Sequence, residues 1–172
     1  MSHGKSLRVI GQSLEAARIA TFELEKHDQH YLVWILSLTK ADELISRHTL
    51  RDKDSGPQNG LQPTANPLFC FSPADISRLD AQAQKRRKNQ SSSATRLSKM
   101  LSHQLRFLGD HLDRIEVSAF QIVWTLGSVF LDYQPVDGQR TCRTFTAEEL
   151  QELCLHGKWP RSSRYLFQRL DI

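Results

Sequence analysis

The chain has 172 residues, of which 39% are hydrophobic, and it carries a formal net charge of +4. This balance argues against a wholly disordered chain, and no apolar run approaches the roughly 20 residues that a membrane-spanning helix needs. The segment Met1–Leu7 lacks the apolar core of a signal peptide, and the three cysteines include no CxxC pair. We therefore expect a cytoplasmic protein, of one domain or two small ones, that does not enter a membrane.

A set of residues recurs along the chain at a constant offset of 98 positions. The residues Leu7, Arg8, Gly11, Leu14 and Phe22 return as Leu105, Arg106, Gly109, Leu112 and Phe120. A second similarity relates residues 71–76 (FSPADI) to residues 145–150 (FTAEEL). A repeat of this length is typical of a duplicated structural unit. The sequence therefore predicts two related halves, residues 1–90 and 91–172, packed as one unit.

The first half opens with a predicted amphipathic helix over residues 6–18, in which apolar residues recur at helical spacing. Phe22 and Leu24 then alternate with glutamates, which predicts a half-buried strand. Residues 31–36 (YLVWIL) predict a second strand that is apolar on both faces.

Residues 37–66 are rich in proline and glycine towards their end and predict a long insertion loop. Residues 68–71 predict a third strand, in which we expect Cys70 to be a buried, inert thiol. A helix follows directly, with Ser72 as its N-cap and Asp75 at its third position.

The second half opens with a stronger amphipathic pattern, which predicts a helix over residues 97–115. Three strands are predicted next, over residues 120–126, 129–133 and 140–145, with a hairpin loop at residues 135–138.

A final helix is predicted from a capping box formed by Thr146 and Glu149, and Gly157 is its predicted C-cap. Residues 159–172 predict a short C-terminal helix. The fold class is therefore α+β, with two pseudo-symmetric helix–three-strand–helix (αβββα) repeats and antiparallel sheets. The strands either form two packed sheets or join into one six-stranded sheet.

Gly11 and Gly109 occupy equivalent positions inside the two opening helices. Glycine in a helix costs about 1 kcal/mol relative to alanine. Its presence in both helices favours a close approach of a neighbouring element at each position.

Seven basic residues and no acidic residue occur between residues 81 and 109. They are Lys85, Arg86, Arg87, Lys88, Arg96, Lys99 and Arg106. Concentrated positive charge can neutralise several phosphates, so these residues form a candidate nucleic-acid-binding segment. The alternative is a solvated linker whose basic residues lie at a helix C-terminus, where positive charge is favoured.

Arg8 and Arg106 each follow a core-facing leucine at equivalent positions of the repeat. If a twofold axis relates the halves, the two guanidinium groups would line one anion site. The alternative is a pair of surface arginines whose stems pack along their own helices.

Large apolar side chains outside the expected core form another candidate surface. Leu32 and Trp34 lie on the second face of their strand, and Trp159 and Phe167 lie in the tail. We interpret these four residues as a candidate surface for a protein partner. Homodimerisation through the strand over residues 31–36 is a further alternative.

Sequence motifs of catalytic sites are absent. There is no glycine-rich phosphate loop, nucleophile elbow or HExxH motif, and the histidines lack the spacing of metal ligands. The carboxylate pairs Glu23/Glu25 and Glu148/Glu149 are interpreted as exposed residues of a strand and of a helix start. We therefore expect no catalytic residue, metal or cofactor.

These observations favour a non-catalytic binding module of bacterial style, with either a protein or a nucleic acid as its partner. The alternatives are a small enzyme with a cleft between the two halves and a homodimeric structural protein.

Overall fold

The computed structural model describes residues 2–36, 69–86, 96 and 100–159, and within them the chain forms four helices and six strands. The helices are α1 (His3–Ala16), α3 (Pro73–Arg86), α5 (Leu101–Arg114) and α6 (Ala147–His156). The strands are β1 (Phe22–His27), β2 (His30–Ile35), β3 (Phe69–Phe71), β4 (Val117–Trp124), β5 (Ser128–Pro135) and β6 (Thr141–Thr146). The fold is α+β, as the sequence predicted.

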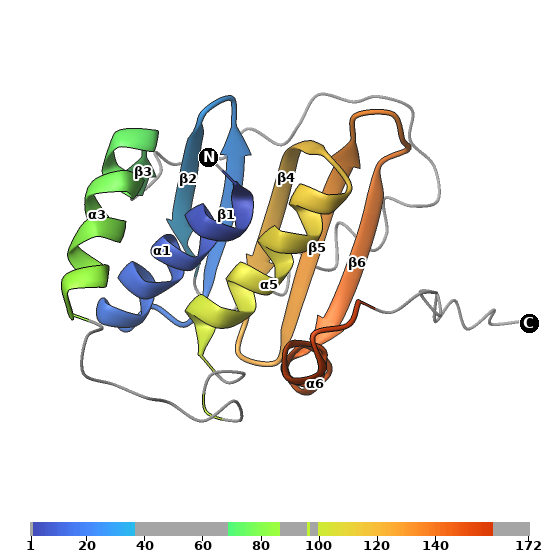
Figure 1. Cartoon of the computed structure of the whole chain (residues 1–172). Coiled ribbons are helices and arrows are strands. Elements are labelled where there is room, and N and C mark those ends of the chain that lie inside the picture. The colour runs from blue at the N-terminus through green and yellow to red at the C-terminus, as the bar shows by residue number, and fades with distance from the viewer. Residues whose placement is uncertain (1, 37–68, 87–95, 97–99, 160–172) are drawn as a thin grey trace, which may run out of the picture.

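The six described strands form one antiparallel sheet in the order β3-β2-β1-β4-β5-β6 (Figure 1). Its centre is the β1–β4 pair, in which Leu24 lies opposite Ile122 and Glu25 lies opposite Gln121. Strands β2 and β3 extend the sheet from β1, and β5 and β6 extend it from β4. Of the two arrangements that the sequence left open, the single joined sheet is therefore the correct one.

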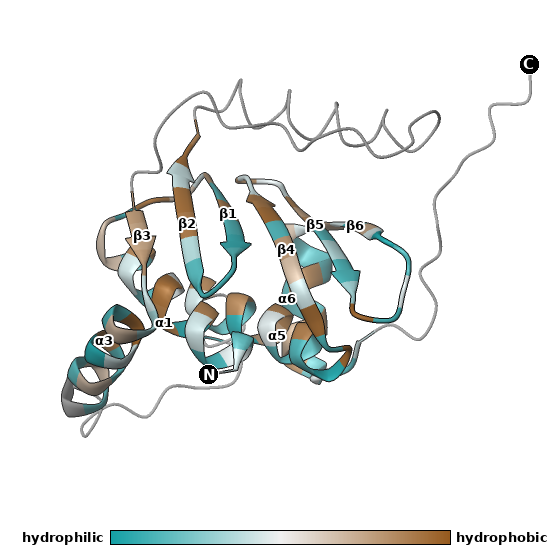
Figure 2. Ribbon diagram, turned by 90° about the horizontal axis from the view of Figure 1, so that it is seen from above, coloured by the Kyte–Doolittle hydropathy of each residue, from teal (hydrophilic) through white to brown (hydrophobic). Residues whose placement is uncertain are grey.

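All four described helices cover the same face of the sheet (Figure 1), as the view from above also shows (Figure 2). Successive side chains of a strand point to opposite faces, so every second one meets the helices. Phe22, Leu24 and Ile122 are fully buried on this face, and they share one core with Leu7 of α1 and Leu105 of α5. Burial of apolar surface, at about 25 cal/mol per Å², makes this core the main stabilising element.

Helices α1 and α5 lie side by side in the middle of the helix layer (Figure 1). A Cβ atom on Gly11 would lie 2.6 Å from the Cα of Ser102, and one on Gly109 would lie 2.6 Å from the backbone nitrogen of Gly4. Real Cβ atoms essentially never come so close. The backbones of the two helices can therefore touch at these two points only because residues 11 and 109 are glycines. The predicted close approach at both glycines is confirmed, and the contacts make the two helices antiparallel.

Carboxylates fasten the ends of the same two helices. Asp113, near the C-terminus of α5, accepts hydrogen bonds from the backbone nitrogens of His3 (2.7 Å) and Gly4 (3.0 Å) at the start of α1. In the same way Glu15 of α1 accepts from the backbone nitrogen of Ser102 (3.2 Å) at the start of α5. Each carboxylate thus satisfies N–H groups that a helix N-terminus leaves without a partner, and its charge suits the positive end of the helix dipole.

The predicted caps of the two outer helices are confirmed. The backbone nitrogen of Asp75 donates to Ser72 Oγ (3.2 Å), and that of Ser72 donates to the Asp75 carboxylate (3.1 Å). Thr146 and Glu149 form the same reciprocal capping box at the start of α6. Gly157 ends α6 in the left-handed conformation, with φ of 65°.

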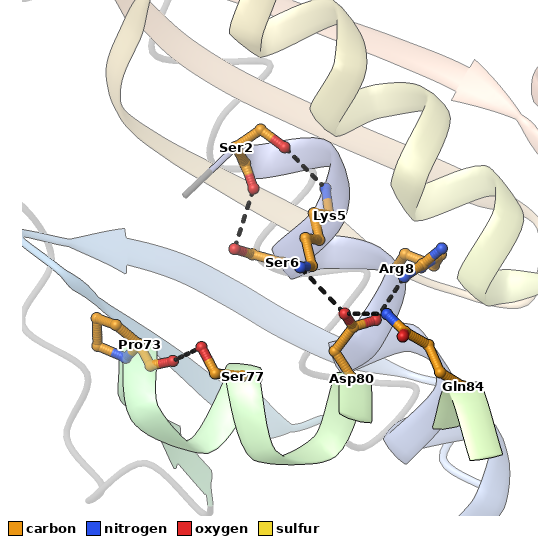
Figure 3. Close-up of polar contacts among 8 residues, drawn as sticks. All are labelled: Ser2, Lys5, Ser6, Arg8, Pro73, Ser77, Asp80 and Gln84. Carbon is orange, nitrogen blue, oxygen red and sulfur yellow. Dashed lines mark hydrogen bonds and ion pairs between the residues drawn. The ribbon is translucent and has the colours of Figure 1, made fainter. Parts of the chain in front are cut away.

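An ion-pair cluster joins α3 to α1 (Figure 3). Asp80, which is 3% exposed, accepts hydrogen bonds from Arg8 Nη2 (2.5 Å) and Gln84 Nε2 (2.8 Å) and forms an ion pair with Lys5 Nζ (3.0 Å). Burial alone would raise the pKa of Asp80, but the hydrogen bonds and charges of Lys5 and Arg8 outweigh it and lower the pKa. The carboxylate is therefore ionised and paired in the folded protein.

His111 of α5 packs among aromatic rings on the opposite side of the helix layer. Its ring stacks on Trp159 with centroids 3.5 Å apart and meets Tyr133 edge-on. Burial lowers the pKa of His111 to about 4, and the positive charges of Arg143 and Arg114 add to this effect. The imidazole is therefore neutral in the folded protein at pH 7.

Several predictions of exposure or burial are wrong. Cys70 is exposed, because it lies on the edge strand β3 and points away from the helices. Trp34 is buried at 6% exposure, and Leu32 is half-buried. Trp159 is half-buried against His111 and the core. These three side chains therefore do not form a freely exposed surface, and Phe167 lies outside the described residues.

The element boundaries differ from the predicted ones where capping residues were overlooked. Helix α1 begins at His3 rather than at residue 6, because the Ser2 side chain caps it by accepting from the Lys5 nitrogen (3.3 Å). The predicted loop over residues 37–66 and the boundary between residues 90 and 91 lie outside the described residues. So does nearly all of the predicted C-terminal helix over residues 159–172.

Replacing Gly109 with Ala is expected to destabilise the fold by about 1–3 kcal/mol, because its Cβ would overlap the backbone of Gly4. The cost of this overlap exceeds the roughly 1 kcal/mol by which alanine is favoured over glycine in a helix, so the net effect is a loss of stability. Gly127→Ala is the matched control, since a Cβ there would meet nothing within 4 Å. Urea unfolding measures both changes, and equal midpoints for the two variants would contradict the close packing.

The neutral state of His111 predicts a loss of stability in acid. The unfolded chain binds a proton near pH 6.5 and the folded chain only near pH 4, so stability falls as the pH drops through this window, by about 3 kcal/mol. His111→Phe keeps a ring against Trp159 and should remove most of this fall. His3 and His103, whose pKa values burial also lowers, contribute to the remainder.

The control for this experiment is His156→Phe, which changes an exposed histidine at the end of α6. Thermal unfolding of the three proteins between pH 4 and pH 7 makes the comparison. An undiminished acid-induced loss of stability in His111→Phe would show that this side chain is not responsible.

Candidate functional site

The face of the sheet turned away from the described helices, here called the far face, carries two unlike rows of side chains. Glu25, Gln121, Asp132 and Cys142 are successive cross-strand neighbours on β1, β4, β5 and β6. They form the polar row. The next row contains Trp34, Glu23, Val123, Phe130 and Thr144 in the same register. Its members Trp34, Val123 and Phe130 are buried and form the apolar row.

A cavity of about 270 Å³ lies at the polar row. Its polar lining comes from Glu25, Lys26, Gln121, Asp132, Gln134 and Arg140. Phe120, Tyr133 and Ala119 complete the wall. The cavity, here called the polar pocket, lies towards the end of the sheet that carries the β1–β2 turn and the β5–β6 loop, which share one edge of the molecule (Figure 1).

Asp132 and Arg140 form a two-pronged ion pair across the β5–β6 hairpin. Arg140 Nε donates to Asp132 Oδ1 (2.8 Å) and Oδ2 (3.0 Å), and Arg140 Nη2 donates to Oδ2. Asp132 is 3% exposed, whereas the Arg140 side chain is 60% exposed. The hydrogen bond to Asp132 raises the pKa of Arg140. A buried carboxylate without this partner would be strongly destabilising, so the pair fixes Arg140 at the rim of the pocket.

Glu23 and Gln121 join the two rows. Gln121 Nε2 donates a hydrogen bond to Glu23 Oε1 across the β1–β4 pair. Burial raises the pKa of Glu23, and the hydrogen bond from Gln121 opposes this effect in part. The interpretation of Glu23 as an exposed strand residue is wrong, because it is only 9% exposed.

Glu25 differs from its neighbours because its side chain forms no hydrogen bond or ion pair with another described residue. It is half-buried, and burial raises its pKa. The charge of Glu23 raises the pKa further, whereas His27 lowers it. The pocket therefore contains a partly desolvated carboxyl group that no described cation neutralises.

The second cation of the pocket, Lys26, is held by the backbone. Its Nζ donates to the carbonyl oxygens of Asp28 (2.7 Å) and Ser118 (2.9 Å). Ser118 lies at the irregularity where the register of β4 shifts, between Val117 and Ala119. The lysine thus ties the β1–β2 turn to the start of β4 and does not pair with Glu25.

The residues of the candidate nucleic-acid-binding segment are only partly described. Lys85 and Arg86 belong to the last turn of α3, and Arg96 is exposed. Arg106 is half-exposed, and its Nε lies 3.5 Å from Asp110 on the same helix. Arg87, Lys88 and Lys99 lie outside the described residues.

The anion site proposed for Arg8 and Arg106 does not appear as one site. Arg8 contacts Asp80 on α3, and Arg106 contacts Asp110 on its own helix. Each guanidinium group therefore has its own carboxylate partner, and no described contact brings the two arginines together.

The polar pocket was missed at the level of sequence because its residues come from three separate strands and a hairpin loop. Glu25, Gln121 and Asp132 meet only through the register of the sheet. One signal was available in the sequence. Asp132 interrupts an otherwise apolar strand, and an acidic residue in such a strand needs a partner.

Comparison of the chain with family models, curated proteins and solved structures finds no match. None of the described helices is long and apolar enough to cross a membrane. Among the described residues, no group of three or more His, Cys, Asp or Glu side chains is arranged to hold a metal ion.

Replacing Glu25 with Gln is expected to stabilise the protein at pH 7. Because the pKa of Glu25 is raised in the fold, the folded state binds the proton more tightly than the unfolded state. The folded protein therefore loses stability as the pH rises from the ordinary pKa of the carboxyl group through the raised one. Gln removes this penalty, so its melting temperature should exceed that of wild type at pH 7 and approach it near pH 4.

Glu152→Gln, on the exposed surface of α6, is the control for the change in net charge. Differential scanning fluorimetry between pH 4 and pH 8 follows all three proteins. A lower melting temperature for Glu25→Gln at pH 7 would mean that the carboxylate has a stabilising partner.

Proposed function

We propose that the chain is an internal duplication of an αβββα unit, with the β1–β4 pair at the junction. The register of the sheet supports this proposal, because the pair Leu24 and Val33 corresponds to Ile122 and Leu131 at the same offset of 98. The junction pair Leu24 and Ile122 maps onto itself, as a twofold axis through the sheet requires.

The contacts between α1 and α5 support the duplication independently. Gly11 touches Ser102, and Gly109 touches Gly4. Residues 11 and 109 are equivalent in the repeat, as are residues 4 and 102, so the duplication turns each contact into the other. The hydrogen bond from Ser102 to Glu15 and the one from Gly4 to Asp113 exchange in the same way. Even the residues with left-handed backbone at the helix ends correspond, with φ of 56° at Arg18 and 51° at Glu116.

For the function, we propose a non-catalytic binding module that recognises a polypeptide at the polar pocket. The observation that carries this proposal is the divergence of the proposed halves on the far face. On the helix side, Leu7 matches Leu105. On the far face, Glu25 corresponds to Val123 and Asp132 corresponds to Trp34. Within the described residues, the proposed halves therefore share a core, but Glu25 and Asp132 of the polar pocket have apolar counterparts in the other half, which points to a role beyond folding.

The size of the pocket favours a small group as its occupant. Pockets for drug-sized ligands measure about 300–1,000 Å³. At about 270 Å³, the polar pocket falls just below this range. A single side chain of a bound polypeptide suits this volume.

The charges of the pocket favour a polypeptide over a nucleic acid at this surface. Two carboxylates, those of Glu25 and Asp132, and two cations, Lys26 and Arg140, line the pocket. A phosphate group would therefore meet no excess of positive charge here, unlike the basic footprint that nucleic-acid-binding surfaces usually have. Nucleic acid stays the alternative for the basic segment over residues 85–106.

Selection of random peptides on the full-length protein tests this function. A phage-displayed library is panned against wild type, and the enriched peptides are measured by fluorescence anisotropy. Ala119→Phe fills the pocket without removing a polar contact, because Ala119 lines it and is exposed. Micromolar binding that weakens about tenfold in this variant would support the proposal.

Ala81→Phe is the matched control, since Ala81 is exposed on α3 at the other face of the sheet. A failure to enrich peptides, or equal affinities for wild type and Ala119→Phe, would contradict polypeptide binding at the pocket. Short RNA and DNA duplexes in the same assay test the basic segment, and their binding should not respond to Ala119→Phe.

A further inference from the structure

The charge balance of the polar pocket indicates what kind of side chain it accepts, and this step rests on the proposed function. Of the two cations in the lining, Arg140 uses Nε and Nη2 on Asp132, and Lys26 donates to two backbone carbonyls. Neither one contacts Glu25. The cations of the pocket are therefore committed to holding the hairpin and the β1–β2 turn.

The acceptors of the pocket are less fully used. Glu25 has no partner among the described residues, and the like charge of Glu23 lies on the same strand and the same face. Gln121 donates its amide N–H to Glu23, which leaves its carbonyl oxygen as an additional acceptor. A half-buried carboxyl group beside a second one is stabilised by a cation that enters the cavity.

We propose that the polar pocket receives the cationic side chain of a lysine or arginine from the bound polypeptide, with Glu25 as its carboxylate. The ammonium or guanidinium group donates to Glu25 and to the Gln121 carbonyl, which form a charge-assisted contact. The exposed Ala119 and the stem of Gln134, which also line the cavity, suit the aliphatic stem of such a side chain. Arg140, held at the rim by Asp132, discriminates against a second positive charge next to the first.

Capped amino acids test this proposal in the full-length protein. The probes are the N-acetyl methylamides of lysine and arginine, and their neutral counterparts of similar shape are those of norleucine and citrulline. Titration of ¹⁵N-labelled protein by NMR gives the dissociation constants and locates the shifted residues. We expect the cationic probes to shift residues of the polar pocket and to bind at least about fivefold more tightly than the neutral ones.

Two variants separate the role of Glu25 from a general effect of charge. Glu25→Gln preserves the shape of the side chain and should weaken the cationic probes by at least about fivefold, while leaving the neutral probes unchanged. Glu152→Gln removes the same charge from the exposed surface of α6 and should change nothing. Equal binding of cationic and neutral probes, or an unchanged affinity in Glu25→Gln, would overturn the proposal.

The outcomes also distinguish this proposal from the proposed function. Selected peptides that bind wild type and lose affinity in Ala119→Phe, but not in Glu25→Gln, would support polypeptide binding while rejecting the cationic side chain. Peptides whose affinity is insensitive to both variants would reject the pocket altogether.

Discussion

The contact between α1 and α5 is the constraint on which the rest of the structure depends. Because Gly11 and Gly109 allow the two backbones to touch, the helices form a narrow pair above the centre of the sheet. That spacing lets both of them pack on the β1–β4 junction, where Leu24 and Ile122 are fully buried. Larger residues at the two glycines would separate the helices and open the core directly above the strands that join the two sides of the sheet.

The two faces of the sheet are under different constraints. The helix-covered face must be apolar at every second strand position, because the four helices have no other core to share. The far face carries no such requirement from the helices, and it combines the buried apolar row with the charged polar row. A buried Asp132 is tolerated there because Arg140 satisfies it twice. The pocket thus occupies the part of the sheet where side chains can change without disturbing the helix packing.

The features that the sequence predicted are those set by local chemistry or by repetition. The caps of α3 and α6 and the strand positions follow from residues near one another in the chain, and the close approach at Gly109 follows from the recurrence of glycine at equivalent positions of the two opening helices. The pocket could not be predicted, because Glu25 and Asp132 become neighbours only through the register of three strands. Cys70 was predicted to be buried and Trp34 to be exposed, and both predictions were wrong because burial depends on where a strand lies in the fold, such as the edge position of the strand that carries Cys70.

In the proposed duplication, the twofold axis through Leu24 and Ile122 exchanges the polar row with the apolar row. A symmetric far face would offer two equal sites, one on each side of the junction. Instead, Asp132 stands where the other half has Trp34, and Glu25 stands where it has Val123. Glu25 and Asp132 line the polar pocket, whereas Trp34 and Val123 at the matching positions are buried. In the proposed binding mode, this asymmetry would set the direction in which a bound polypeptide lies, which a symmetric pair of sites would leave undetermined.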